Sequence, residues 1–154
     1  MQRFFAPGRT ELAGNHTDHQ LGRVLAASVD VGITARATRR RDRRVCIHSK
    51  GFRPFTVVLD DLAVDPRAYG KPWALVRGMA AQLMQQGVEL RGCTLELQSD
   101  IPAGAGLSSS AAFELCVGTA LAVLGGWKIS LHGATAAGDV DYASKRLTPL
   151  HLAQ

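Results

Sequence analysis

The chain has 154 residues, enough for one domain with a hydrophobic core, and its 46% hydrophobic content is typical of globular proteins. No apolar run reaches the length of a membrane span, and the N-terminal segment is too short and too broken for a signal peptide, so we expect no membrane partner. The net charge of +5 comes largely from arginines between positions 36 and 44. Three scattered cysteines without a CxxC pair predict buried free thiols, a cytoplasmic protein and no cysteine-bound metal: Cys46, Cys93 and Cys116.

The N-terminal region combines a strand with a polar segment. The strand is predicted from residue 4 and is expected to break at the Pro7-Gly8 pair. The following residues, 10–20, include four side chains that donate or accept hydrogen bonds: Asn15, His16, Asp18 and His19. This mixture suits a polyhydroxylated ligand, and it equally suits a metal ion or a polar surface turn. Spacing alone does not choose among these three interpretations.

Several further strands are predicted before the first helix. Residues 24–37 predict one long bent strand or two strands, and residues 45–49 and 55–59 predict two more. Short connections between successive strands indicate antiparallel pairing. The arginines between them form either a nucleic-acid-binding patch or the solvated tip of a hairpin. No aromatic side chains interleave with these arginines to stack bases, so we expect a hairpin tip and no nucleic-acid partner.

The second half alternates helices with a strand. Residues 73–84 have helical spacing and follow Pro72, a favoured residue at a helix start. Residues 92–99 predict a strand whose alternate side chains Cys93, Leu95 and Leu97 face a core. Residues 111–124 are nearly all apolar and predict a helix buried on most sides, ended by two glycines.

A glycine- and serine-rich loop joins that strand to the last predicted helix. Its sequence is Pro-Ala-Gly-Ala-Gly-Leu-Ser-Ser-Ser-Ala-Ala, residues 102–112, with Ser108 or Ser109 as the expected N-cap. Unpaired N–H groups and the positive dipole end at a helix N-terminus suit an anion, and serine hydroxyls can contact phosphate or Mg²⁺. The loop lacks both the GxxxxGK[ST] pattern and the third glycine of the dinucleotide fingerprint. We interpret it as a triphosphate-binding loop of another kind.

Two stretches of the sequence resemble one kinase superfamily. Residues 102–112 resemble the second motif of the GHMP kinases, which include galactokinase, homoserine kinase, mevalonate kinase and phosphomevalonate kinase. Residues 7–18 resemble the galactokinase signature PGRVNLIGEHTDY, and residues 73–78 loosely match a W-x-x-Y-V-R-G segment of galactokinases. Asn15 replaces the usual glutamate, Thr10-Glu11 replaces Val-Asn, and His19 replaces tyrosine.

The resemblance implies a fold and an activity. The fold is α+β, with an antiparallel sheet packed against helices as in the GHMP kinase N-terminal domain. The activity is transfer of the ATP γ-phosphate to the anomeric hydroxyl of galactose, with ATP and Mg²⁺ as cofactors. The resemblance implies that Arg9 lies near the reacting phosphoryl group and that four residues contact the sugar: Asn15, His16, Thr17 and Asp18. The implied nucleotide contacts are Ser49, Gly104, Ala105, Gly106, Leu107, Ser108, Ser109 and Ser110, with Ser110 also at Mg²⁺.

The resemblance covers only part of a complete galactokinase. Residues 1–130 are expected to form the GHMP N-terminal domain, and residues 131–154 a divergent or truncated segment. The family's catalytic aspartate, found in a G-x-x-D-Q context, is not matched, nor is a third glycine-rich motif. We therefore expect an N-terminal fragment that is inactive by itself. The alternatives are another GHMP small-molecule kinase, or a sugar or ATP sensor without catalysis.

Overall fold

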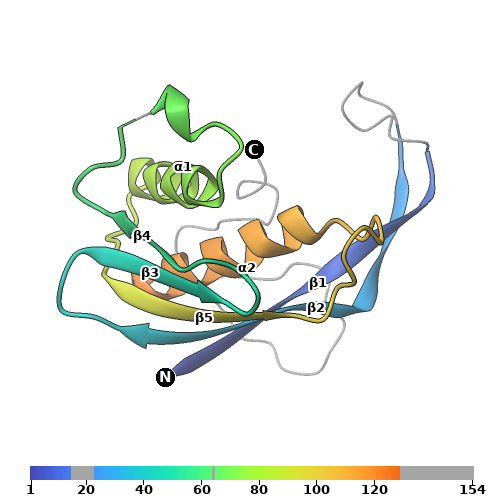
Figure 1. The fold of residues 1–154 in the computed structure, drawn as a ribbon, viewed down its shortest axis with the longest axis horizontal. Helices are drawn as coiled ribbons and strands as arrows, with labels where there is room; N and C mark the ends of the chain where they lie inside the picture. The colour runs from blue at the N-terminus through green and yellow to red at the C-terminus, as the bar shows by residue number, and fades with distance from the viewer. Residues whose placement is uncertain (15–22, 64, 129–154) are drawn as a thin grey trace.

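A computed structural model describes residues 1–14, 23–63 and 65–128 of the protein (Figure 1). Within these ranges one five-stranded sheet has the order β1-β2-β5-β3-β4. Its strands are β1 (Gln2–Ala13), β2 (Leu25–Arg39), β3 (Arg44–Ser49), β4 (Phe55–Val58) and β5 (Cys93–Ser99). Two α-helices, α1 (Pro72–Gln85) and α2 (Ser109–Leu124), and a short 3-10 helix, η2 (Pro66–Ala68), complete these elements.

The helices cover one face of the sheet. On β5 the side chains of Cys93, Leu95 and Leu97 are buried, as the alternation predicts, while those between them point to the open face. The same alternation on β2 buries Ile33 and Ala35. Helix α2 lies across β1 and β2 and packs against α1, so one continuous core lies between sheet and helices (Figure 1). The predicted α+β architecture is confirmed.

Helix α2 is the central helix of this core. Its apolar sequence buries residues on several sides, among them Cys116, Val117 and Leu121. The helix ends at Leu124 with Gly125 as its C-cap, and Gly126 follows with a positive φ of 91°, as the glycine pair predicts. No helix in the described part of the chain is long and apolar enough to cross a membrane.

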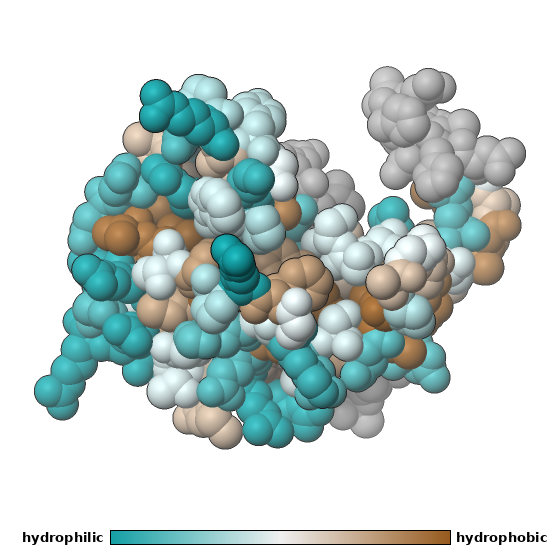
Figure 2. Space-filling view, in the orientation of Figure 1, coloured by the Kyte–Doolittle hydropathy of each residue, from teal (hydrophilic) through white to brown (hydrophobic). Residues whose placement is uncertain are grey.

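Strand β1 is longer than the sequence predicts. It does not end at the Pro7-Gly8 pair but continues to Ala13, because β1 is an edge strand and an edge strand tolerates a residue without an N–H group. Strands β1 and β2 extend beyond the last pair of β2 with β5, Ile33 and Ser99, and form a two-stranded arm (Figure 1). Apolar side chains are exposed on this arm, including Leu12 and Leu25 (Figure 2).

The prediction of a hairpin between β2 and β3 is wrong. Strand β5 lies between them, antiparallel to β2 and parallel to β3, so the sheet is mixed and the arginine-rich turn crosses the start of β5. The other two pairs, β1 with β2 and β3 with β4, are antiparallel as predicted. The Arg40 N–H donates to the Gly92 carbonyl at 2.8 Å, which holds the crossing turn against the start of β5. A side chain at Gly92 would lie 1.9 Å from the Asp42 carbonyl oxygen, so only glycine fits there.

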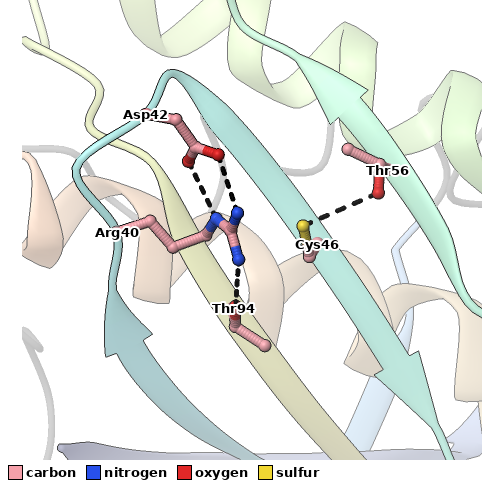
Figure 3. A network of polar contacts seen from close by, with 5 residues as sticks. All are labelled: Arg40, Asp42, Cys46, Thr56 and Thr94. Atoms are coloured by element: carbon pink, nitrogen blue, oxygen red, sulfur yellow. Dashed lines mark hydrogen bonds and ion pairs between the residues drawn. The ribbon is translucent and has the colours of Figure 1, made fainter.

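Two arginines of this turn, Arg40 and Arg43, are paired with neighbouring groups of the protein. Arg40 donates to both carboxylate oxygens of Asp42, at 2.8 and 2.7 Å, and to the Thr94 hydroxyl at 3.4 Å (Figure 3). The hydrogen bonds from Arg40 hold the pKa of Asp42 below its ordinary value. Arg43 forms an ion pair with Asp60. These contacts give the turn a structural role that the sequence does not predict.

The three cysteines have different exposure. Cys93 and Cys116 are buried free thiols, and burial raises their pKa values to about 12 and about 11. Cys46 is only partly buried on the open face of the sheet, where the Thr56 hydroxyl donates to its sulfur at 3.6 Å (Figure 3). The prediction of buried free thiols is thus confirmed for two of them.

We predict that a thiol reagent at neutral pH modifies Cys46 alone in the folded chain. The thiolate is the reactive form, and both burial and raised pKa keep Cys93 and Cys116 protonated and inaccessible. Mass spectrometry of the labelled chain, before and after unfolding in denaturant, measures this. Equal modification of all three sites without unfolding would contradict the described core.

Candidate functional site

The glycine loop ends in an unusual backbone conformation. Three alternate residues have a left-handed backbone: Gly104 at φ 73°, Gly106 at φ 67° and Ser108 at φ 54°. Positive φ at every second residue is typical of a nest, in which successive N–H groups face one side and suit an anion, and we refer to residues 104–108 as the nest. Ser108 is the one non-glycine residue with positive φ in the described ranges. The loop therefore has a backbone pattern that is compatible with an anion-binding nest.

Helix α2 begins directly after this nest. Ser108 is its N-cap as predicted, but its side chain forms no capping hydrogen bond, because the left-handed backbone differs from the extended form of a normal N-cap. Its carbonyl accepts the Ala112 N–H at 3.0 Å. Ser109 and Ser110 are exposed in the first turn, which contains no acidic residue. The hydroxyls and the positive end of the helix dipole are therefore available to an anion.

The structure brings Arg9 to the glycine loop. The Arg9 N–H donates to the Leu107 carbonyl at 3.1 Å, although the two residues belong to motifs far apart in the sequence. Gly8, next to Arg9, is buried against the same carbonyl. The arginine side chain itself is exposed. Arg9 and the predicted phosphate loop are thus parts of one local structure.

Ser49 lies elsewhere on the sheet. It is half-buried at the end of β3, beside Leu97 of β5, and lines a shallow hollow with His48, Lys50 and Pro54. No hydrogen bond in the described part of the chain joins it to the glycine loop. The four predicted sugar contacts lie outside the described residues: Asn15, His16, Thr17 and Asp18. The two strands of the arm flank them in sequence, since β1 ends at Ala13 and β2 begins at Leu25.

Sequence reasoning missed two features of this region. The first is the contact of Gly8 with the loop, for which the only sequence signal is a Pro-Gly pair inside an apolar strand. The second is a charged hollow on the open face of the sheet, lined by Arg3, Arg36, Lys50, Glu96 and Asp100 among others. The sequence feature that could have predicted this hollow is the presence of charged residues at the outward-facing positions of strands whose other residues are apolar. Neither this hollow nor the one beside Ser49 is lined by three side chains that commonly bind metals. No group of three or more His, Cys, Asp or Glu side chains that could hold a metal ion is found across the described ranges.

Two protein families match separate parts of the chain. The galactokinase galactose-binding signature matches residues 2–39, and the GHMP kinases N terminal domain matches residues 74–139. The galactokinase of Lactococcus lactis subsp. lactis (strain IL1403) is 39% identical over 123 residues, which are 79% of this chain and 31% of that protein. The galactokinase of Bacillus subtilis (strain 168) is 36% identical over 122 residues, 77% of this chain and 31% of that protein. The chain thus spans about a third of the length of these curated relatives.

Solved structures give the same result. The structure of Lactococcus lactis galactokinase complexed with galactose matches with a TM-score of 0.72 and 35% identity, over 84% of this chain and 34% of that one. Methanococcus jannaschii mevalonate kinase matches in fold, with a TM-score of 0.64 and 18% identity over 78% of this chain and 39% of that one. From the fold, the joined motifs and these matches together, we conclude that the chain belongs to the GHMP kinase superfamily and is galactokinase-like in sequence.

Proposed function

We propose that this chain supplies the phosphate-binding and sugar-binding elements of an ATP-dependent galactose kinase. The reaction is transfer of the γ-phosphate to the anomeric hydroxyl of galactose, which gives galactose 1-phosphate and ADP. The observation that carries the proposal is the hydrogen bond between the Arg9 N–H and the Leu107 carbonyl. It joins a strand within the range matched by the galactose-binding signature to the loop that suits a triphosphate. Phosphoryl transfer depends above all on such mutual positioning.

The nucleotide would be held by the glycine loop. The nest from Gly104 to Ser108 offers N–H groups to the phosphate oxygens, and the start of α2 adds its dipole. The exposed hydroxyl of Ser110 fits a role at Mg²⁺, because hard cations prefer oxygen ligands and keep phosphate oxygens in their shell. Mg²⁺ bound there would neutralise charge on the phosphates. Ser49 remains a proposed nucleotide contact on the strength of the family resemblance alone.

The sugar would be held by the segment after β1. Asn15, His16, Thr17 and Asp18 offer both donors and acceptors to hydroxyl groups. Arg9, whose backbone N–H donates to the glycine loop and whose side chain is exposed, would stabilise charge that develops on the transferred phosphoryl group. Asn15 in place of glutamate keeps a carbonyl acceptor but removes a charge, so we expect altered sugar affinity.

The domain boundary and the cellular location also belong to this proposal. Residues 1–130 form the GHMP domain, and the aspartate that acts on the sugar hydroxyl is supplied outside the matched motifs. A cytoplasmic location agrees with the free thiols. A second candidate is a sugar or ATP sensor, which would use the same glycine loop and polar segment to bind its ligands without turnover.

A chimeric protein tests the proposed activity. Residues 1–130 are joined to the remaining part of the Lactococcus lactis galactokinase, and ADP release is measured with galactose, mevalonate or homoserine. We predict turnover with galactose only, at roughly 1–100 per second as in ordinary kinases.

In the same protein, Ser110→Ala should raise the KM for Mg·ATP far more than the KM for galactose. A preference for mevalonate or homoserine would contradict the substrate, and a folded chimera that binds both ligands without turnover would favour the sensor.

A further inference from the structure

We infer that Gly8 is a positioning residue, whose missing side chain lets the phosphate loop dock on β1. The docked atom is the Leu107 carbonyl oxygen, which accepts the Arg9 N–H at 3.1 Å. The contact itself is independent of the proposed function. Its consequence for nucleotide binding rests on that function, because only a phosphate-holding loop needs this placement.

The space beside Gly8 cannot accept a Cβ atom unless a neighbouring atom moves. A Cβ atom there would lie 2.9 Å from the Leu107 carbonyl oxygen, 3.1 Å from the Val29 Cγ2 atom and 3.3 Å from the Ile101 Cδ1 atom. The two side-chain contacts could relax by small rotations. The nearest atom belongs to the backbone of the loop, so relief of that contact requires the loop to move away from β1. A methyl group at position 8 would therefore act on the loop directly.

An irregularity in the sheet places Gly8 at this point. Pro7 pairs with Gly32 and Arg9 pairs with Ser28, so Gly8 faces residues 29–31 of β2 across a shift in register. Bulges of this kind bend a strand and re-aim neighbouring groups, and they occur often next to functional sites. Here the shift lies where the loop after β5 returns to β1 (Figure 1). The strand and the loop are thus fitted to each other.

The contact fixes the nest relative to the arginine. Leu107 lies between Gly106 and Ser108, both of which have the left-handed backbone. A shift of its carbonyl would therefore move the N–H groups on both sides of it and the start of α2. It would also change the distance between these groups and Arg9. Displacements near 1 Å can cost a catalytic or binding site about 10²-fold.

The test compares three variants of the 154-residue chain. Gly8→Ala introduces the contact with Leu107. Gly125→Ala is the matched control, because its Cβ would be crowded to 2.6 Å from the Val88 Cγ1 atom, at the other end of α2. The double variant Gly8→Ala with Val29→Ala removes the nearer of the two side-chain contacts, that with the Val29 Cγ2 atom, and leaves the contact with the Leu107 backbone. Hydrogen exchange of the Arg9 amide and of residues 103–108 is followed by NMR, and the affinity for Mg·AMPPNP is measured by calorimetry.

In Gly8→Ala we expect the Arg9 amide to exchange about tenfold faster, and the affinity for Mg·AMPPNP to fall roughly tenfold. Gly125→Ala should lower thermal stability but change neither quantity by more than about twofold. The double variant should regain stability without regaining affinity. Full recovery of affinity in the double variant would overturn the inference, since it would show a packing effect alone.

Two further results separate this inference from the proposed function. An Arg9 amide that exchanges without protection in the unaltered chain would overturn the contact, whether or not Gly8→Ala folds. A protected Arg9 amide in a chain that does not bind Mg·AMPPNP would contradict the proposed function and the nucleotide half of the inference, and would leave the docking of the loop intact.

Discussion

Gly104→Ala is expected to weaken Mg·AMPPNP binding by roughly tenfold or more, whereas Gly70→Ala leaves it unchanged. The two glycines are a matched pair: both have φ of 73°, and a Cβ at either would meet nothing within 4 Å. Both substitutions therefore cost about 1 kcal/mol of backbone strain, with no clash. Only Gly104 belongs to the nest, so only its substitution tilts the N–H groups that would meet the phosphates.

Calorimetric titration of the 154-residue chain and its two variants measures the difference. Thermal unfolding of the same samples checks that both variants lose similar stability. Equal loss of affinity in the two variants would mean that general destabilisation, and not the shape of the nest, controls binding. Unchanged affinity in Gly104→Ala would place the phosphates elsewhere.

The second large effect is on catalysis. The 154-residue chain, given galactose and Mg·ATP, is expected to release ADP at least about 10²–10⁴-fold more slowly than a complete kinase. The reason is that its sequence contains no G-x-x-D-Q aspartate to act on the sugar hydroxyl, and a missing general base has an effect of this size. The chimera described above is the positive control, since it supplies the rest of the site.

A coupled assay of ADP release on monodisperse protein measures this rate, with ATP hydrolysis in the absence of galactose as the background. Turnover of roughly 1–100 per second would contradict the expectation. It would also bring Asp139 and Asp141, which lie outside the described residues, into consideration as bases.

Local patterns in the sequence predict much of this fold. The alternation of Cys93, Leu95 and Leu97 is enough to predict which face of β5 is buried, because side chains on a strand alternate strictly. The apolar run of α2 and its terminal glycines likewise predict a buried helix and its end. Each of these predictions depends on residues close together in the chain.

The errors concern features that depend on distant residues. The Pro7-Gly8 pair ends an interior strand but not an edge strand, and the position of β1 at the edge is set by the whole sheet. The parallel pairing of β3 with β5 requires an arrangement in which β5 separates two strands that follow each other in sequence. The docking of Gly8 on Leu107 and the left-handed Ser108 arise from the same tertiary arrangement. Motif resemblance found the candidate site, but only the fold relates Arg9 to the loop.

The central claim is that the glycine loop and the adjoining arm hold a nucleoside triphosphate and a sugar side by side. NMR titration of the uniformly labelled 154-residue chain, first with Mg·AMPPNP and then with galactose, tests it most directly. We predict that the nucleotide shifts the amide signals of residues 104–110 and of Arg9, and that galactose shifts those of residues 14–18. Shifts confined to the open face of the sheet, around Arg36 and Glu96, or no shifts in the loop at saturating nucleotide, would contradict the claim.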